Sequence, residues 1–303
     1  MKRKVLLMGM AGSGKTSMRS IIFANYPAGD TMRLGPTYGL ENTDVKFLGN
    51  LVLNLWDCGA QDSFMENYFE SQREQIFRSV EVLIYVFDVE SQDKEKDMNT
   101  FLRCLSAIEE NSKDARVFCL IHKMDLIQSE EMRQAVFQER AQQITAHAKV
   151  VQITCFGTSI WDETLYKAWS AVVYSLVPNV ERLRSHLSQL CKLCDADEVV
   201  LFETATFLVI ASAEGEDESR RNPDSHRYEK MSNITKQFKL ACSRTQSMFE
   251  AFEVSSPRFS VMMETFTSNT CIMVVLPAQR VETSAIRLNL SVARVLFEHY
   301  INN

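Results

Sequence analysis

The chain has 303 residues, of which 46% are hydrophobic and 24% are charged. These values are typical of globular proteins and exclude a wholly disordered chain, and roughly 150 residues per domain predicts two domains. The 33 Lys and Arg residues against 39 Asp and Glu residues give a net charge of −6. We expect no binding to nucleic acid, since that requires a basic surface, and no direct membrane insertion, since no apolar run approaches roughly 20 residues.

Residues 1–178 alternate between strand-like and helix-like segments. Expected strands are residues 4–8, 44–48, 51–56, 80–88, 116–121 and 150–155, and expected helices are residues 15–26, 96–111, 130–147 and 164–176. Gly49 and Asn50 predict a tight turn between the second and third strands. Repeated βα alternation predicts an α/β domain with a mostly parallel sheet and helices on both faces.

The order of elements changes after Pro178, so we place a second domain at residues 179–303. Expected helices are residues 180–193, 228–249 and 283–300, and expected strands are residues 198–202, 206–211, 252–254, 259–267 and 270–276. Hairpins between helices predict an α+β domain with an antiparallel sheet. This half contains no phosphate loop. Cys191 and Cys194 lie in an apparent amphipathic helix without a second Cys or His pair at zinc spacing, so we interpret them as structural.

The clearest chemical motif joins the first strand to the first helix. Residues 9–16 fit the pattern G-x-x-x-x-G-K-[ST], whose glycines let backbone N–H groups turn toward phosphates at the positive end of the helix. Lys15 would reach the β and γ phosphates, and the Thr16 hydroxyl would bind Mg²⁺. The phosphate-binding residues predicted from this loop are Gly9, Ala11, Gly12, Ser13, Gly14, Lys15, Thr16 and Ser17.

A second motif follows the strand at residues 51–56. Asp57 ends this strand, where a carboxylate can hold Mg²⁺ through water. Alone, an ordinary strand-end Asp would be the simpler interpretation. The segment from Asp57 to Gln61 resembles the D-x-x-G-Q segment of small GTPases, which implies that Gln61 orients the attacking water. The alternative for Gln61 is a solvated polar residue at the start of a helix.

Two later loops carry residues suited to a purine base. Residues 122–125, with the sequence H-K-M-D, resemble the guanine-reading N-K-x-D motif, with His in place of Asn. The Asp125 carboxylate can accept hydrogen bonds from both guanine N1–H and the N2 amine, which adenine does not offer together. Residues 158–160 resemble the S-A-x loop that packs beside the base. Each motif is weak alone, but four in this order on alternating strands predict a GTP-binding module. The predicted guanine-binding residues are His122, Lys123, Asp125, Ser159 and Ile160.

Longer segments sharpen this resemblance, at residues 17–26, 47–50, 54–59, 64–69, 158–163, 238–240 and 266–270. They resemble the Rag family of small GTPases, in particular the Rag A/B subgroup, called Gtr in fungi, over essentially the whole chain. The resemblance implies a roadblock-type C-terminal domain that pairs with a C/D-type Rag GTPase. It also implies a cytoplasmic heterodimer, held at the lysosomal or vacuolar membrane by a scaffold complex, that signals amino-acid sufficiency to the TOR kinase complex.

Three residues depart from the family pattern: Pro36, Tyr38, which stands where the family usually has Ile, and Ala60. By resemblance Thr37 is the first switch threonine, a ligand of Mg²⁺ that also closes over the γ-phosphate, and Pro36 precedes it where the family usually has Ala. Proline fixes φ and removes a backbone donor, so one hypothesis is that Pro36 changes the proportion of open and closed conformations of this loop. The alternative is that the loop tolerates the substitution without such a change. Ala60 stands where the family has a Gly whose N–H meets the γ-phosphate. Alanine keeps that N–H but is strained wherever φ is positive, so we hypothesise that Ala60 slows hydrolysis.

These residues leave two functions from different classes. The first is a molecular switch that binds GTP and GDP with Mg²⁺ and hydrolyses GTP slowly. No residue can be assigned as an arginine finger, so we expect a GTPase-activating protein to supply one. The second is a state-locked subunit whose nucleotide is structural, which Pro36 and Ala60 favour. A P-loop ATPase or kinase is disfavoured by Asp125. We predict the switch.

Overall fold

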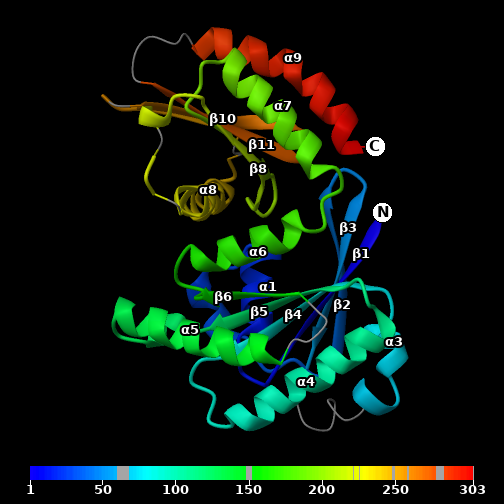
Figure 1. The fold of residues 1–303 in the computed structure, drawn as a ribbon. Coiled ribbons are helices and arrows are strands. Elements are labelled where there is room, and N and C mark those ends of the chain that lie inside the picture. Colours follow the sequence, from blue (N-terminus) through cyan, green and yellow to red (C-terminus); the bar gives the residue numbers. More distant parts are fainter. Residues whose placement is uncertain are drawn as a thin grey trace. The chain divides into compact units, whose positions relative to one another are not determined.

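The computed structural model describes residues 1–59, 68–147, 152–220, 222–224, 226–247, 250–257, 259–277 and 283–302 (Figure 1). The chain divides into two compact units. The first comprises Met1–Val45 and Val52–Ala168, and the second comprises Lys46–Leu51 and Trp169–Asn303. Every helix within the described ranges is too short or too polar to span a lipid bilayer.

A six-stranded sheet organises the first unit. Its strands are β1 (Lys2–Gly9), β2 (Leu40–Leu48), β3 (Leu51–Cys58), β4 (Val80–Asp88), β5 (Arg116–His122) and β6 (Ile153–Thr158), in the spatial order β2-β3-β1-β4-β5-β6. β1 pairs in parallel with β3 and β4, and β5 pairs in parallel with β4 and β6. β2 and β3 form a hairpin through the turn at Gly49, where φ is 51°. This mixed, mainly parallel sheet fits the expected P-loop GTPase domain.

Helices cover both faces of this sheet, as predicted. They are α1 (Lys15–Phe23), α3 (Arg73–Phe77), α4 (Lys94–Asn111), α5 (Glu130–Ala146) and α6 (Thr164–Tyr174), with 3₁₀ turns at Ala28–Arg33 and Met124–Leu126. α1 and the start of α6 lie on one face, and α3, α4 and α5 lie on the other (Figure 1). Alternate strand residues such as Tyr85 and Phe87 pack against α4 at Phe101. The side chain of Asp93 caps α4, and that of Ser129 caps α5.

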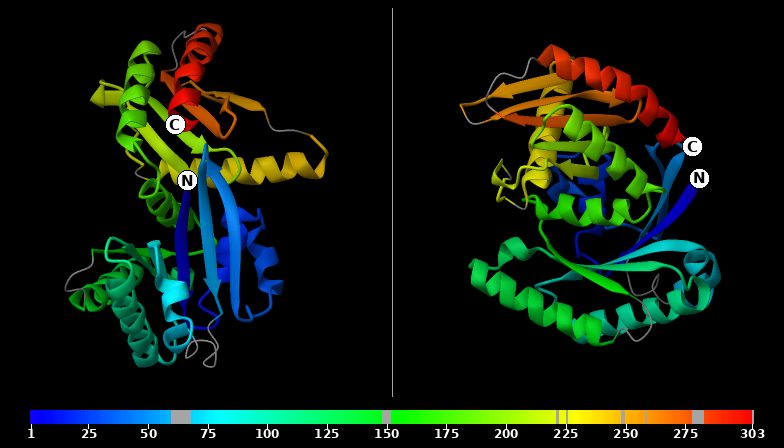
Figure 2. Two further views of the ribbon diagram at one scale, coloured as in Figure 1. Left: turned by 90° about the vertical axis from the view of Figure 1, so that its right-hand side faces the viewer. Right: turned by 45° about the horizontal axis from the view of Figure 1, so that its top comes forward.

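The second unit contains the predicted antiparallel sheet. Its strands are β7 (Glu198–Glu203), β8 (Val209–Glu214), β9 (Ala251–Ser255), β10 (Phe259–Thr267) and β11 (Thr270–Pro277), in the order β8-β7-β11-β10-β9. The remaining elements are α7 (Val180–Leu193), α8 (Arg227–Arg244), α9 (Thr283–Asn302) and a 3₁₀ turn at Glu218–Arg220. Figure 2 shows α7 and α9 on one face of the sheet and α8 on the other. The described part is consistent with a second domain.

One strand of this unit differs from its predicted position. Residues 206–211 were expected to be extended, whereas β8 begins at Val209. The Glu203 carboxylate accepts hydrogen bonds from the Thr206 backbone N–H at 2.7 Å and from the Thr206 hydroxyl at 2.6 Å. These bonds fold residues 203–206 into a turn, and Phe207 then has a φ of 57°. Local side-chain bonding to the backbone therefore delays the strand.

Candidate functional site

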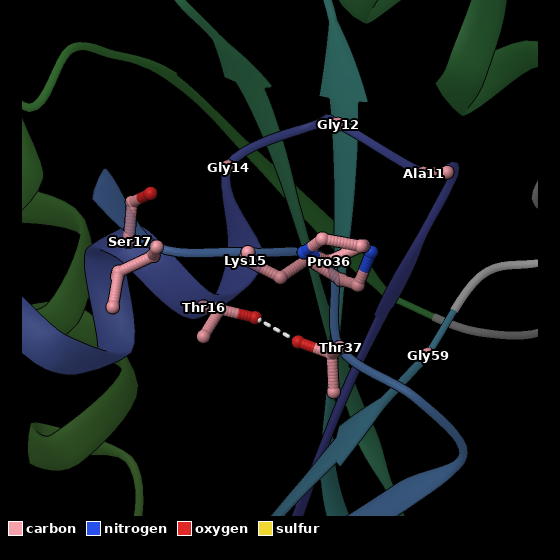
Figure 3. A pocket seen from close by; sticks show the side chains of 11 residues that line it. Ala11, Gly12, Gly14, Lys15, Thr16, Ser17, Pro36, Thr37 and Gly59 are labelled. Carbon is pink, nitrogen blue, oxygen red and sulfur yellow. Dashed lines mark hydrogen bonds between the residues drawn. The ribbon is translucent and has the colours of Figure 1, made fainter. Parts of the chain in front are cut away.

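The loop between β1 and α1 wraps around an open cavity of about 330 Å³. Gly14 has a φ of 93°, a left-handed conformation that favours glycine. Gly9 lies so close to β4 that a Cβ atom there would be 2.3 Å from the Val86 carbonyl oxygen. Residues 34–37 complete the lining of the cavity, and Figure 3 shows Thr37 beside Thr16. Backbone N–H groups and a helix N-terminus around such a cavity are suited to an anion.

Lys15 is the buried cation of this loop, with only 6% of its surface exposed. Its Nζ donates hydrogen bonds to the carbonyl oxygens of Gly9 at 2.9 Å and Met10 at 3.0 Å. Burial lowers the pKa of Lys15, and the nearby Asp57 charge opposes that shift. Because the carbonyl groups carry only partial charge, the buried ammonium would gain further stabilisation from an anion in the cavity.

Three oxygen-bearing side chains meet beside Lys15. The Thr16 and Thr37 hydroxyl oxygens are 2.5 Å apart (Figure 3), and the Thr16 hydroxyl donates to Asp57 Oδ2 at 2.9 Å. The Asp57 side chain is fully buried, and its Oδ1 has no hydrogen-bond partner among the described residues. Burial raises the pKa of Asp57, partly offset by the hydrogen bond from Thr16. Carboxylate and hydroxyl oxygens are the ligands that Mg²⁺ prefers, so this cluster fits the predicted metal.

His122 connects the phosphate loop to the other end of the site. Its Nδ1 lies 2.9 Å from the Thr158 hydroxyl oxygen. A Cβ atom on Gly14 would lie 2.8 Å from His122 Cδ2 and 2.9 Å from Nε2, so the imidazole packs directly against the loop. Burial lowers the pKa of His122 to about 4, and the ring is therefore neutral at pH 7. Its role in this structure is packing and hydrogen bonding.

The predicted base-reading residues lie together after β5 and β6. The Ser159 hydroxyl donates to Asp125 Oδ1 at 2.6 Å, and the Trp161 N–H donates to Ser159 Oγ at 3.0 Å. Lys123 has a φ of 65°, which is uncommon for a non-glycine residue. Its ammonium is held by Asp88 at the end of β4, with Nζ 2.5 Å from Oδ2. The loop thus presents a positioned carboxylate at Asp125.

The structure brings most of the sequence-predicted residues into two adjoining groups. The cavity is lined by Ala11, Gly12, Gly14, Lys15, Thr16, Ser17, Thr37 and Gly59, and the second group contains His122, Lys123, Asp125, Ser159 and the half-buried Ile160. Ala60 and Gln61 lie outside the described residues. Asp88, Gly59 and Arg19 also belong to the site and were not predicted from the sequence. Asp88 ends a buried strand in the same way as Asp57, and that signal could have found it.

Comparison with known proteins agrees with this geometry. Residues 4–235 match the Gtr1/RagA G protein conserved region. The chain is 56% identical over 303 residues to "Ras-related GTP-binding protein A" of Dictyostelium discoideum, covering all of this chain and 99% of that protein. It is 54% identical over 298 residues to "GTP-binding protein gtr1" of Schizosaccharomyces pombe, covering 98% and 96%. "Ras-related GTP-binding protein C" of Homo sapiens is 26% identical over 215 residues, covering 70% of this chain and 53% of that protein.

The fold and the site define a GTPase of the P-loop class. The chain belongs to the Gtr1/RagA family of G proteins, and the high identity to A-type and Gtr1 relatives places it with the Rag A/B type.

Proposed function

We propose that this chain is a guanine-nucleotide switch that binds GTP and GDP with Mg²⁺ and hydrolyses GTP slowly. The observation that carries the proposal is that Lys15, Thr16 and Thr37 line one cavity, while the Thr16 hydroxyl contacts both Thr37 and the buried Asp57 carboxylate. Thr16, Thr37 and Asp57 would hold Mg²⁺, which neutralises phosphate charge when bound. The GTP-binding domain would comprise residues 1–178, and a GTPase-activating protein would accelerate the reaction.

Guanine selectivity in this proposal rests on Asp125. Its Oδ1 is fixed by the Ser159 hydroxyl, and Ser159 is itself held by the Trp161 N–H. A carboxylate in a fixed position accepts from both N–H groups on one edge of guanine, whereas adenine offers a different pattern. His122, Lys123 and Ile160 would shape the surrounding loops, and Gln61 would orient the attacking water.

Single-turnover hydrolysis of bound GTP tests the switch against the state-locked alternative. The natural chain, in complex with a C/D-type Rag partner, is compared with Ala60→Gly and with Gln61→Leu. We expect measurable cleavage by the natural chain, faster cleavage by Ala60→Gly and none by Gln61→Leu. Equal rates for the first two would show that Ala60 is neutral, which leaves the switch intact. Cleavage by the glycine variant alone would support the state-locked subunit.

We also propose that residues 179–303 form a roadblock-type domain that pairs with a C/D-type Rag GTPase. A groove of about 450 Å³ lies between α8 and the strands β9 and β10, and it is lined by Met231, Ile234, Thr235, Phe238, Phe252, Val254, Phe259 and Val261. β9 is one of the two edge strands of its sheet. An edge strand beside an apolar groove offers backbone hydrogen bonds and apolar contact together, which is how partner strands are often added.

Matched substitutions test this interface. Ile234, on α8 beside the groove, is 61% exposed, and Leu193, at the end of α7 on the opposite face of the sheet, is 74% exposed. We expect Ile234→Asp to abolish co-purification with the C/D-type partner and Leu193→Asp to preserve it, with both chains still binding GDP. Loss of the partner in both variants, or in neither, would contradict the assignment of this groove.

Finally, we propose that the heterodimer is cytoplasmic, peripheral at the lysosomal or vacuolar membrane through a scaffold complex, and signals amino-acid sufficiency to the TOR kinase complex. Membership of the Gtr1/RagA family supports this role. Cells that lack the chain should lose amino-acid-dependent phosphorylation of TOR substrates, and the natural chain should restore it. Restoration by a Lys15→Ala variant would separate signalling from nucleotide binding and contradict the proposal.

A further inference from the structure

Arg19 lies on α1, one turn after Thr16, and its guanidinium joins two strands. Nε is 3.3 Å from Asp57 Oδ2 at the end of β3. On β2, the guanidinium donates to Glu41 Oε2 at 2.6 Å and to Thr43 Oγ1 at 3.4 Å. The Arg19 side chain is only 19% exposed. The planar fork of an arginine is suited to holding several oxygens at fixed positions.

The two oxygens of the Asp57 carboxylate have different surroundings. Oδ2 receives the Thr16 hydroxyl and faces Arg19 Nε, whereas Oδ1 has no hydrogen-bond partner among the described residues. Rotation about the terminal torsion of an aspartate is broad, so a carboxylate held by one hydroxyl alone would sample several orientations. Arg19 Nε makes no hydrogen bond to a described residue, so its contact with Oδ2 is an ion pair. The Arg19 charge therefore favours the orientation in which Oδ2 faces it, and Oδ1 keeps its capacity to accept from another ligand.

The loop that carries Thr37 has little packing behind it. Residues 34–37 line the phosphate-side cavity and also a second cavity of about 400 Å³, whose other lining includes Arg19, Glu41 and Thr43. A loop between two cavities depends on its ends for its position. β2 begins at Leu40, immediately after this loop, so the bond from Arg19 to Glu41 anchors the end of the loop.

A backbone contact makes a second link between the same segments. The Gly59 N–H donates to the Gly39 carbonyl at 2.7 Å. A Cβ atom on Gly59 would lie 2.6 Å from the carbonyl oxygens of both Thr37 and Gly39. The Thr37 loop and the segment after Asp57 are thus in direct contact, and a shift of one would disturb the other.

We propose that Arg19 is a positioning residue that couples the Asp57 carboxylate to the Thr37 loop through Glu41. The inference rests on the proposed guanine-nucleotide site, and it assigns Arg19 a part in the retention of Mg²⁺ and nucleotide there. Loss of Arg19 frees both the carboxylate and the loop, so Mg²⁺ is retained less well and nucleotide escapes faster. An ordinary surface ion pair would have almost no such effect, because exposed pairs contribute little.

The test is the release rate of fluorescent GDP from the full chain at a series of free Mg²⁺ concentrations. Arg19→Gln should need about ten times more Mg²⁺ for half-maximal slowing of release, the size expected from one lost charge-assisted hydrogen bond. With EDTA present, its release rate should equal that of the natural chain. The matched control is Arg73→Gln, which breaks the Arg73–Glu110 ion pair at 2.8 Å in the same unit and should change nothing.

Two further variants separate coupling from a general loss of structure. Glu41→Gln should produce part of the shift, and adding it to Arg19→Gln should produce no further shift. Arg19→Lys keeps the charge but not the fork, so it should lie between the natural chain and Arg19→Gln, and it serves if the glutamine variant does not fold.

A response to Mg²⁺ equal to that of the control, or faster release by the same factor in EDTA, would overturn the inference. Absence of GDP binding by the natural chain would instead refute the proposed nucleotide site itself.

Discussion

The two units of this chain both bury charged side chains, but their described residues arrange these charges differently. Lys15 at the start of α1, Asp57 near the end of β3 and His122 at the end of β5 gather around the loop between β1 and α1. Lys15 lines the cavity, Asp57 accepts a hydrogen bond from Thr16, and His122 packs against Gly14. In the second unit, Glu203 is satisfied within its own turn by the N–H groups of Ala205 and Thr206. Arg227 of α8 also meets Glu198 of β7 at 2.7 Å and Glu214 of β8 at 2.5 Å, so opposite charges from separate elements pair in the second unit too. Burial of a charge is therefore not enough to identify a site in this protein, and the first unit is distinguished by the cavity that Lys15, Thr16 and Thr37 line.

Strand direction explains the contrast. The carboxyl ends of parallel strands lie at one edge of a sheet, so residues that follow β1, β3, β4, β5 and β6 gather there. All pairs in the second sheet are antiparallel, so successive strand ends lie at opposite edges. In such a sheet the residues that follow the strands do not gather at one edge. The described feature beside its edge strand β9 is instead an apolar groove.

The largest effect should follow removal of the buried cation at the point of convergence. Lys15→Ala should weaken GDP and GTP binding by at least about 100-fold, because two charge-assisted contacts to phosphate are lost. The matched control is Lys2→Ala, whose exposed ammonium pairs with Asp44 at 2.8 Å and which should bind as the natural chain does. Equilibrium titration with fluorescent GDP measures both. Equal GDP affinity in the Lys15→Ala and Lys2→Ala variants would show that the buried Lys15 contributes no more to nucleotide binding than an exposed lysine.

A smaller effect, with a change of preference, is expected at the base-reading loop. Asp125→Asn replaces an acceptor with a donor, so GDP binding should weaken by about 10- to 100-fold. Xanthosine diphosphate, which carries an acceptor where guanine carries the N2 amine, should bind the variant better than it binds the natural chain. Competition titrations with both nucleotides provide an internal control for folding. Parallel weakening of both would show that Asp125 holds the loop and does not read the base.

The smallest effect concerns a buried charge of the second unit, Lys236 on α8, which is 2% exposed. Burial lowers the pKa of Lys236 from 10.5 to about 7, although the nearby Glu203 charge opposes this. Between pH 7 and pH 10.5 this lysine is protonated in the unfolded chain and largely deprotonated in the folded chain. The unfolded chain therefore binds more protons, so this residue makes the free energy of unfolding rise with pH. The contribution approaches about 1 kcal/mol per pH unit.

Lys236→Met should remove that dependence, and Lys230→Met, on the exposed side of α8 in an ion pair with Asp224, should not. Hydrogen exchange of β7 and β11 amides between pH 7 and 9, corrected for intrinsic rates, reports the local opening free energy. Nucleotide affinity should be unchanged in both variants, because this buried charge serves the fold. A loss of GDP binding in Lys236→Met alone would show that this lysine of the second unit supports nucleotide binding, which would contradict the distinction between the two units.

Much of this fold could be predicted because the responsible signals are local. The bounds predicted for α7, residues 180–193, and for β10, residues 259–267, match the structure. α3 was missed because five residues are too few to show helical periodicity. The strand expected at residues 206–211 begins three residues later, at Val209, because the Glu203 carboxylate competes for the backbone, and propensity does not show that competition.

In the candidate site, too, residues with a local sequence signal could be predicted and residues whose contacts depend on the fold could not. Lys15, Asp57 and Asp125 could be named from short motifs, each with its own local mechanism, although their roles in nucleotide binding stay predictions. Arg19 could not be named, because its partners lie 22 and 38 residues away and meet it only through the fold. The consequence of Ala60 also stays a prediction, since that residue lies outside the described part of the chain.

The central claim is that the convergent residues of the first unit bind guanine nucleotides. Its most direct test is displacement of fluorescent GDP from the full natural chain, with Mg²⁺ present, by unlabelled GTP, GDP or ATP. We predict that GTP and GDP compete at least about 100-fold better than ATP, the difference expected from two hydrogen bonds at Asp125. Equal competition by ATP, or failure of the chain to bind GDP at all, would contradict the account.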